Sequence, residues 1–175
     1  MIHEYCVFVS LAENFNKKFK GHFMELLEIK KLLHHREPYL MVDKVIEVSS
    51  ELIHTQKDMG EHPIIEGHFP GAPIVPGAML QEMCTQAAGV LITRYHAPVE
   101  DYDSEKTKGY ALGVLREVKS AKFLGMTRPD KIIDIKVRLE KIARTRFDFY
   151  GEIYQDERCS AKINFQLVNI PGELL

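Results

Sequence analysis

The sequence predicts an α+β fold in which one buried helix lies among about five or six antiparallel strands. Residues 76–96 are apolar on nearly every side, which is typical of a helix buried within its domain. Apolar and charged residues alternate strictly in the segment 131–142, and the segments 145–154 and 159–168 repeat the pattern. Strands with one wet face are typical of an antiparallel sheet, so this alternation indicates the fold class.

The composition indicates one domain and gives no sign of a nucleic-acid partner or a metal site. The chain has 175 residues, enough for a substantial core, with 45% hydrophobic and 27% charged residues. A net charge of −2 gives no support for nucleic-acid binding. The cysteines Cys6, Cys84 and Cys159 form neither a CxxC pair nor a zinc pattern. We therefore expect a reducing compartment and no metal site.

The N-terminus carries a short apolar run at residues 5–12. No positive stretch precedes this run, and no small-residue cleavage site follows it. No apolar run in the chain reaches the ~18 residues needed to span a bilayer. We therefore expect neither a signal peptide nor a membrane span, and we expect a cytoplasmic protein.

The first element is a short helix that follows an N-terminal extension. Residues 1–23 are basic in part and lack periodicity, so we interpret them as an extension of unknown role before a single domain at 24–175. Met24 opens an amphipathic helix, which should end before Pro38 because proline disfavours helical geometry at the preceding residue. The apolar stripe of this helix consists of Leu26, Leu27, Ile29, Leu32 and Leu33.

Alternation of apolar and polar residues predicts the remaining strands, and segments rich in Pro and Gly predict the loops between elements. Two strands joined by a polar turn come first, then a loop, the long helix, a polar loop and the later strands. In chain order the predicted elements are strands 39–49 and 51–58, a Pro/Gly loop 60–77, a helix 76–96, a loop 97–109 and strands 110–123, 131–142, 145–154 and 159–168. The long helix is apolar on all sides, but the sheet covers only one of them. We therefore expect a second subunit to bury the remaining apolar surface of the helix.

Glu82 lies near the start of the long helix, on a face that should be buried. The simplest interpretation is a first-turn carboxylate favoured by the helix dipole, worth ~0.3–1 kcal/mol. Its neighbours within one turn are small or apolar, such as Ala78 and Met79. Partial desolvation would raise the pKa of Glu82, which would make it a proton donor near neutral pH.

His68 lies in the Pro/Gly loop before that helix. A lone loop histidine is usually a surface or structural residue, but the many prolines and glycines around it predict a stiff, tightly turned loop. Gly77 opens the helix, where backbone N–H groups lack intrahelical partners and can hold a developing oxyanion. A base, an acid and an oxyanion donor close in sequence fit proton abstraction next to a carbonyl.

The motif that contains these residues resembles that of a known family. Segment 67–91, "GHFPGAPIVPGAMLQEMCTQAAGVL", is similar to the signature of the FabZ-type (3R)-hydroxyacyl-[acyl carrier protein] dehydratases. The similarity includes segment 32–48, continues through 121–142, and covers roughly residues 25–169. It implies the hot-dog fold, in which a curved antiparallel β-sheet wraps a long central helix. It also implies dehydration of a 3-hydroxyacyl thioester to a trans-2-enoyl thioester in fatty acid biosynthesis.

The resemblance assigns roles by position. His68 matches the catalytic histidine, Glu82 the catalytic carboxylate, and Gly77 the backbone donor to the thioester carbonyl. In the implied reaction His68 removes a proton beside the carbonyl, Gly77 stabilises the enolate-like oxygen, and Glu82 protonates the departing hydroxyl. Supporting or substrate-binding positions follow from the same resemblance. These are Gln86, His35, Arg36, Pro76 and Gly71.

The resemblance also implies partners. The substrate is an acyl carrier protein that carries a phosphopantetheine-linked 3-hydroxyacyl chain, and neither a metal nor an organic cofactor is needed. The chain is expected to form a homo-oligomer, either a dimer with shared active sites or a trimer of such dimers. In the shared site, His68 of one chain faces Glu82 of the other, in agreement with the helix that needs cover.

The chain departs from the family pattern at several positions. His34 replaces a usual proline, "EHPII" at 61–65 replaces an Asn-Glu-Pro-aromatic-aromatic run, and "RPD" at 128–130 replaces Pro-Gly-Asp. These departures leave open the acyl chain length and whether the pathway is housekeeping or a specialised lipid or polyketide one. The related FabA-type dehydratase–isomerases carry Asp at the acid position, so Glu82 argues against isomerisation.

A basic segment is a candidate surface for binding the carrier protein. Residues 116–146 contain ten Lys and Arg against four Asp and Glu, a net charge of +6. This charge could steer an acidic carrier protein, or it could be the solvated face of alternating strands.

Two other functions remain as alternatives to the dehydratase. One is a hot-dog thioesterase, which would release free thiol. The other is a non-catalytic acyl-binding or assembly subunit, in which His68 and Glu82 could be replaced without effect.

Overall fold

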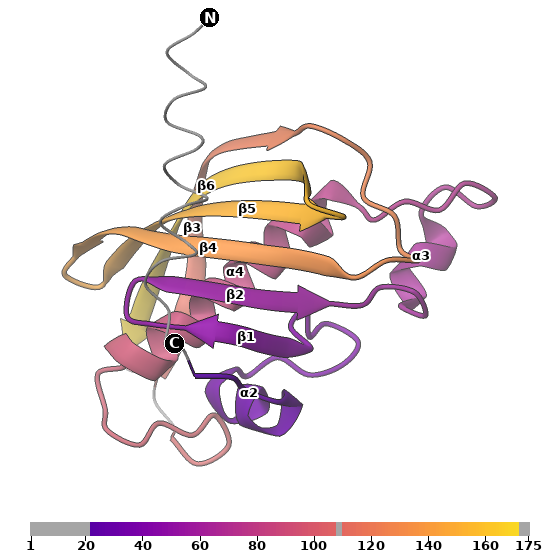
Figure 1. The fold of residues 1–175 in the computed structure, drawn as a ribbon. Coiled ribbons are helices and arrows are strands. Elements are labelled where there is room, and N and C mark those ends of the chain that lie inside the picture. Colours follow the sequence, from indigo (N-terminus) through magenta and orange to yellow (C-terminus); the bar gives the residue numbers. More distant parts are fainter. Residues whose placement is uncertain (1–21, 108–109, 172–175) are drawn as a thin grey trace, which may run out of the picture.

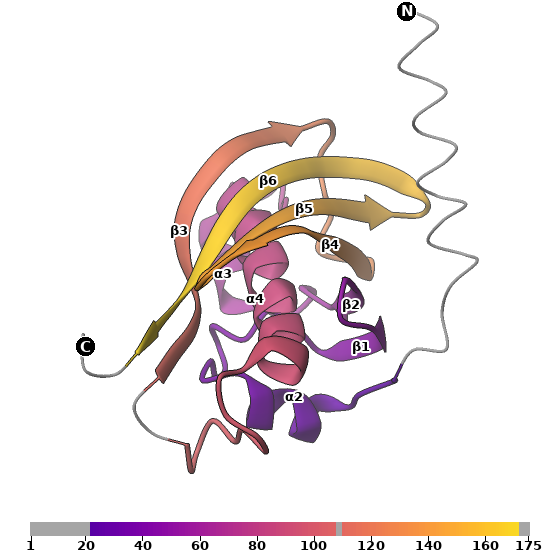
Figure 2. The same ribbon diagram turned by 90° about the vertical axis from the view of Figure 1, so that its left-hand side faces the viewer.

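A six-stranded antiparallel sheet curves around one long helix, α4, in the computed structural model, which describes residues 22–107 and 110–171 (Figures 1 and 2). The strand order is β1-β2-β4-β5-β6-β3, so β1 and β3 form the two edges. The strands are β1 Lys44–Val48, β2 Leu52–Lys57, β3 Tyr110–Phe123, β4 Ile133–Ala143, β5 Arg146–Gln155 and β6 Arg158–Pro171, and the helices are α2 Leu26–Leu32, α3 Pro63–Gly67 and α4 Gly77–His96. The predicted α+β class and its hot-dog arrangement are confirmed.

The core lies between the concave face of the sheet and α4. Alternate residues of the central strands point inward, as the sequence pattern predicted, while their charged neighbours remain on the outer face. The inward set from β4, β5 and β6 includes Ile133, Ile135, Val137, Phe147, Phe149, Ile153, Ile163, Phe165 and Leu167, all of them buried. This packing fixes the depth of α4 and therefore the position of every side chain at its N-terminal end.

The surface of α4 is covered by its own chain and not, as the sequence predicted, by a second subunit. Every residue from Met83 to Thr93 is buried within the single chain, because α2 and the segment 39–42 close the side that the sheet leaves open. The helix therefore leaves little apolar surface for a partner, and that part of the sequence argument was wrong. Several exposed apolar residues lie on the edge strand β3. They include Val114, Leu115, Val118 and Phe123.

The N-terminal elements differ in detail from the prediction. The helix begins at Leu26, because Met24 exchanges backbone hydrogen bonds of 3.1 Å with Val45 in a β-bridge. Leu27 is 77% exposed and lies outside the buried stripe. The predicted strand 39–49 shortens to β1, since its first residues cover α4. The prediction for residues 1–23 falls almost wholly outside the described residues.

The Pro/Gly loop contains a helix that the sequence did not predict. α3 is a single turn, Pro63–Gly67, with His62 as its N-cap and His68 as its C-cap. None of the described helices α2, α3 and α4 combines the length and the apolar character that a membrane span requires.

Candidate active site

His68 is held at the end of α3 by the turns that follow it. Phe69 and Gly71 both have positive φ angles, 55° and 86°, which turn the chain back so that the Ile74 carbonyl meets the imidazole. His68 Nδ1 lies 2.9 Å from that oxygen. A carbonyl only accepts, so Nδ1 carries a proton, and in the neutral ring Nε2 is the nitrogen with the lone pair. Among the described residues Nε2 has no hydrogen-bond partner, which suits a general base.

Glu82 projects from the second turn of α4 into a largely buried position. Its side chain is 13% exposed. Burial raises the pKa of this carboxyl above its ordinary value, while hydrogen bonds from Gln86 and Tyr39 act in the opposite direction. The predicted desolvation of Glu82 is thus present, and it favours the protonated form that a general acid requires.

Gln86 fixes the orientation of Glu82. Its Oε1 accepts the Met41 N–H at 2.7 Å, and its Nε2 donates to the Tyr39 carbonyl and to Glu82 Oε1, both at 2.8 Å. Because a backbone N–H can only donate, the amide cannot be flipped, and Glu82 Oε1 is an acceptor. Gln86 is 1% exposed, so these hydrogen bonds form in a dry environment.

His35 follows α2 in the chain, and its side chain lies near Glu82. Its Nε2 lies 3.9 Å from Glu82 Oε1, and its Nδ1 is buried without a hydrogen-bond partner. Burial lowers the pKa of His35, and the nearby His34 and Arg36 lower it further. Burial therefore shifts both His35 and Glu82 toward their neutral forms.

Arg36 is not brought to the carboxylate. Its guanidinium donates to the carbonyls of Leu33 and His35 at 2.7 and 2.9 Å, and to Ser104 and Glu105 at 3.3 Å. These contacts close the end of α2 and fasten the 97–107 loop to it. In this position Arg36 supports the scaffold around His35.

The start of α4 brings the predicted backbone donor close to β3. Pro76 is the N-cap of the helix and Gly77 is its first residue, where the N–H has no intrahelical acceptor. A Cβ added at Gly77 would lie 3.0 Å from the Phe123 ring. Glycine therefore keeps this backbone open for a close approach between the helix end and the β3 side chain.

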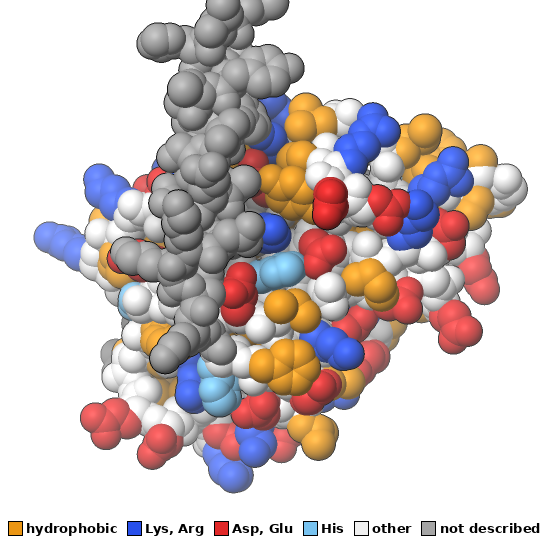
Figure 3. Space-filling view, in the orientation of Figure 1, with side chains coloured by type: hydrophobic (Ala, Val, Ile, Leu, Met, Phe, Trp, Pro, Cys, Tyr) orange, Lys and Arg blue, Asp and Glu red, His pale blue; other side chains and the backbone are white. Residues whose placement is uncertain are grey.

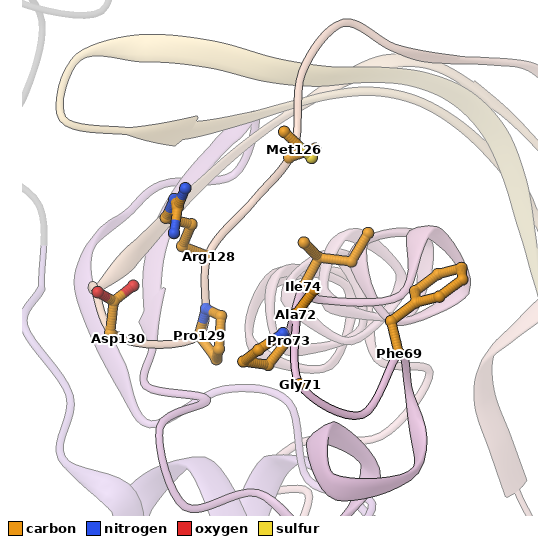
Figure 4. Close-up of a pocket in the computed structure, with 9 residues that line it drawn as sticks. All are labelled: Phe69, Gly71, Ala72, Pro73, Ile74, Met126, Arg128, Pro129 and Asp130. Carbon is orange, nitrogen blue, oxygen red and sulfur yellow. The ribbon is translucent and has the colours of Figure 1, made fainter.

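A groove lies beside the loop that carries His68 (Figure 4). It has a volume of about 660 Å³ and is bounded by residues 69–74 on one side and 126–130 on the other. A backbone hydrogen bond of 2.8 Å from Val75 to Thr127 joins the two loops. Apolar side chains line most of the groove, and Arg128 and Asp130 lie at one end. Figure 3 shows hydrophobic and basic side chains together at the upper right, where β3 leads toward β4.

Within one chain the acid and the base are separate. No hydrogen bond joins His68 to Glu82 among the described residues, although each is held by its own partners. Sequence reasoning missed Tyr39, whose carbonyl and hydroxyl both serve the Glu82–Gln86 pair. It lay in a predicted strand far from the motif, and no local pattern pointed to it.

Known dehydratases match most of the chain. The family model for ApeI-like proteins, described as ApeI dehydratase, matches residues 47–163. The 3-hydroxyacyl-[acyl-carrier-protein] dehydratase FabZ of Alkaliphilus metalliredigens is 31% identical over 152 residues, which cover 83% of this chain and 97% of that protein. The Chlamydia trachomatis FabZ is 34% identical over 149 residues, covering 83% and 92% of the two chains.

Solved structures share the fold at lower identity. The dehydratase heterocomplex ApeI:P from Xenorhabdus doucetiae superposes with a TM-score of 0.62 at 16% identity, covering 88% of this chain and 92% of that one. The Streptococcus mutans protein smu.793, bound to acetyl CoA, gives a TM-score of 0.58 at 14% identity and covers 79% and 96% of the two chains. On the family match and the FabZ identities, the chain belongs to the FabZ- and ApeI-like family of hot-dog-fold dehydratases.

Proposed function

We propose that this protein dehydrates (3R)-3-hydroxyacyl-[acyl carrier protein] to trans-2-enoyl-[acyl carrier protein] in fatty acid biosynthesis, in the cytoplasm. The observation that carries the proposal is the placement of His68 and Glu82 in a chain that belongs to a dehydratase family. The hydrogen bond of His68 Nδ1 to Ile74 leaves Nε2 as the nitrogen that can take a proton, and burial raises the pKa of Glu82. A β-elimination needs one group to take a proton and another to give one.

The reaction follows from these proton states. His68 Nε2 removes a proton from the carbon beside the thioester carbonyl, and the negative charge moves to the carbonyl oxygen. The Gly77 N–H stabilises this oxygen at the start of α4. As the carbon–carbon double bond forms, the bond to the 3-hydroxyl breaks, and Glu82 supplies the proton that lets it leave as water.

The site is proposed to be shared between two chains. His68 and Glu82 are not hydrogen-bonded within one chain, and β3 is an edge strand whose exposed side chains are partly apolar. Pairing of two β3 edges would cover Val118 and Leu115 and bring a second α4 nearby. The Xenorhabdus relative is described as a heterocomplex, so a partner of different sequence is an alternative result of the same test.

Docking of the carrier protein is proposed at the groove in Figure 4. Several basic residues of the 116–146 segment form local ion pairs, such as Lys119 with Asp148, and so behave as a solvated strand face. Neither Lys122 nor Arg128 forms an ion pair within the part of the chain that the structure describes. Arg128 lines the groove, so these two charges remain available to an acidic partner.

The experiment is an assay with 3-hydroxyacyl carrier-protein substrates of several chain lengths, followed through enoyl absorbance. His68→Ala and Glu82→Gln should each lower kcat by about 10²–10⁴-fold, the usual contribution of a positioned proton-transfer group. Glu100→Gln, at an exposed loop residue, is the matched control and should keep wild-type activity. Release of free thiol without enoyl product would indicate a thioesterase, and full activity in both variants would contradict the assignment.

A further inference from the structure

His62 joins the turn that carries His68 to the segment that holds Glu82 of the same chain, which in a shared site serves the second active site. Its Nε2 lies 2.6 Å from the Pro38 carbonyl oxygen, and its Nδ1 lies 3.2 Å from the Ile64 backbone nitrogen. We propose that His62 is a positioning residue for the dehydration, which fixes α3 and therefore His68 relative to the segment 38–41. The expected effect on kcat rests on the proposed function, whereas the contacts of His62 come from the structure.

The two hydrogen bonds define the chemical state of the His62 ring. The Ile64 N–H can only donate, so Nδ1 must carry a lone pair. The Pro38 carbonyl can only accept, so Nε2 must carry the proton. The ring is therefore the neutral Nε2–H tautomer, with one nitrogen capping α3 and the other tying α3 to a distant segment.

The distant segment leads directly to the acid. Pro38 precedes Tyr39, whose carbonyl accepts a hydrogen bond of 2.8 Å from Gln86 Nε2. The same amide donates to Glu82 Oε1 at 2.8 Å. A displacement of Pro38 would therefore be transmitted to the carbonyl that orients Gln86, and His62 is fastened to that point.

On the other side, α3 has few anchors besides His62. Four of its five residues are exposed, and Ile65 is its one buried side chain. His68 follows as the C-cap, with its N–H donating to the Ile65 carbonyl at 3.2 Å. Since so short a turn has little intrinsic stability, its place depends on tertiary contacts, and the Pro38 hydrogen bond is one of them.

The experiment compares three substitutions in the full-length chain. His62→Asn keeps an acceptor for the Ile64 N–H but is too short to donate to Pro38. His62→Gln places an amide donor near the position of Nε2 and gives up the cap. His96→Asn is the matched control, because His96 Nε2 lies 2.8 Å from the Ser50 carbonyl at the far end of α4.

We expect His62→Asn to lower kcat about tenfold or more while KM changes less than about twofold, because a small displacement of a catalytic group costs large factors in rate. His62→Gln should recover most of the lost kcat, and His96→Asn should retain wild-type kcat despite losing a similar hydrogen bond. In ¹H–¹⁵N NMR spectra of the imidazoles, the His68 ring signals should shift in His62→Asn and stay unchanged in His96→Asn.

Wild-type kcat in His62→Asn, or an equal loss in His96→Asn, would overturn the proposal. If His62→Asn does not fold, His62→Gln decides, because it must retain kcat if the Pro38 hydrogen bond positions the turn and lose it if only the cap matters. A wild-type protein without dehydratase activity would refute the proposed function instead. In that event, unchanged His68 ring signals in a folded His62→Asn would separately refute the positioning role.

Discussion

Glu82 is held between influences that oppose one another. Burial favours its neutral form, whereas the Gln86 amide and the Tyr39 hydroxyl favour the carboxylate. A general acid needs both tendencies, because it must hold a proton before the reaction and release it during the reaction. The hydrogen bond from Gln86 Nε2 also orients the carboxyl group through Oε1.

Replacing Glu82 by glutamine should change how stability depends on pH. The folded-state pKa of Glu82 is raised above its ordinary value of 4.5, so the folded protein binds this proton more tightly than the unfolded chain does. The resulting stability is present below about pH 4.5 and is lost as pH rises through the folded-state pKa. Glu82→Gln should therefore gain stability relative to wild type between pH 4 and pH 8.

The measurement is urea unfolding of both proteins across this pH range, at one fixed protein concentration. Glu100→Gln, whose carboxyl lies in an exposed loop, serves as the control and should follow the wild-type pH dependence. A stability difference between Glu82→Gln and wild type that is the same at pH 4 and pH 8 would contradict the raised pKa.

At the scale of elements, α4 approaches β5 so closely that only a glycine fits opposite Cys84. A Cβ added at Gly151 would lie 2.8 Å from Cys84 Sγ and 3.3 Å from Cys84 Cβ. Gly151→Ala should therefore lower the free energy of unfolding by about 1–3 kcal/mol through overpacking. Cys84→Ala removes the sulfur that would clash, so the double variant should lose less than the sum of the two single losses.

Thermal or urea unfolding of the four proteins checks this double-mutant cycle. Gly67→Ala is the control, because nothing lies within 4 Å of a Cβ added at Gly67. Strictly additive losses in the cycle would show that the helix and the strand are not in the close contact described. Because Glu82 lies two residues before Cys84, Gly151→Ala should also lower kcat.

Much of the element pattern could be predicted from the sequence, for a physical reason. The strand β3 and the helix α4 have long, uninterrupted signals, and both were predicted at or within one residue of their ends. α3 was missed because one turn with a single buried isoleucine has no measurable periodicity. The cover on α4 was missed because burial of Leu40 and Met41 depends on tertiary contacts with a helix far along the chain.

The sequence predicts only the local part of the candidate site. The hypotheses for His68, Gly77 and Glu82 came from one continuous motif. The partners of Gln86 could not be found this way, because Met41 and Tyr39 lie 45 and 47 residues from it in the chain. The segment "EHPII" departs from the family pattern, but only the folded chain brings His62 to the Pro38 carbonyl.

At the scale of the whole molecule, a shared site predicts complementation between inactive variants. His68→Ala and Glu82→Gln should each be nearly inactive as homodimers. A heterodimer unites both damaged residues in one site and leaves His68 and Glu82 intact in the other, so about half of its sites should work. Mixing after reversible dissociation, with native mass spectrometry to count heterodimers, checks this. Confirmed exchange without returning activity would mean that both residues act within one chain.

Carrier docking predicts a selective effect on KM. Replacing Lys122 and Arg128 with alanine should raise KM for carrier-protein substrates, and more so at low salt, where screening is weak. Lys44→Ala is the matched charge control, because β1 is the opposite edge of the sheet from β3. If short thioester analogues that lack the carrier suffer equally, Lys122 and Arg128 serve something other than docking.

A chain that begins at Met24 should keep its turnover, in line with the proposed domain at 24–175. Met24 is 2% exposed and bridges to Val45, so the domain needs this residue. The ion pair of His22 with Glu28, at 3.8 Å, is mostly exposed and should contribute little. Steady-state kinetics of the shortened and full-length chains checks the prediction, and lost activity in a folded, dimeric short chain would contradict it.

The edge strand β3 has a consequence for how the protein must be made. Fourteen residues long, it presents unpaired backbone groups beside Val118 and other exposed apolar side chains, and such an edge is a template for misdirected pairing. If two β3 edges pair as proposed above, a second copy would cover this template, and a newly synthesised chain would be vulnerable to aggregation until it pairs. Pairing would also stabilise the folded chain by mass action, and more so as its concentration rises above the dissociation constant of the pair.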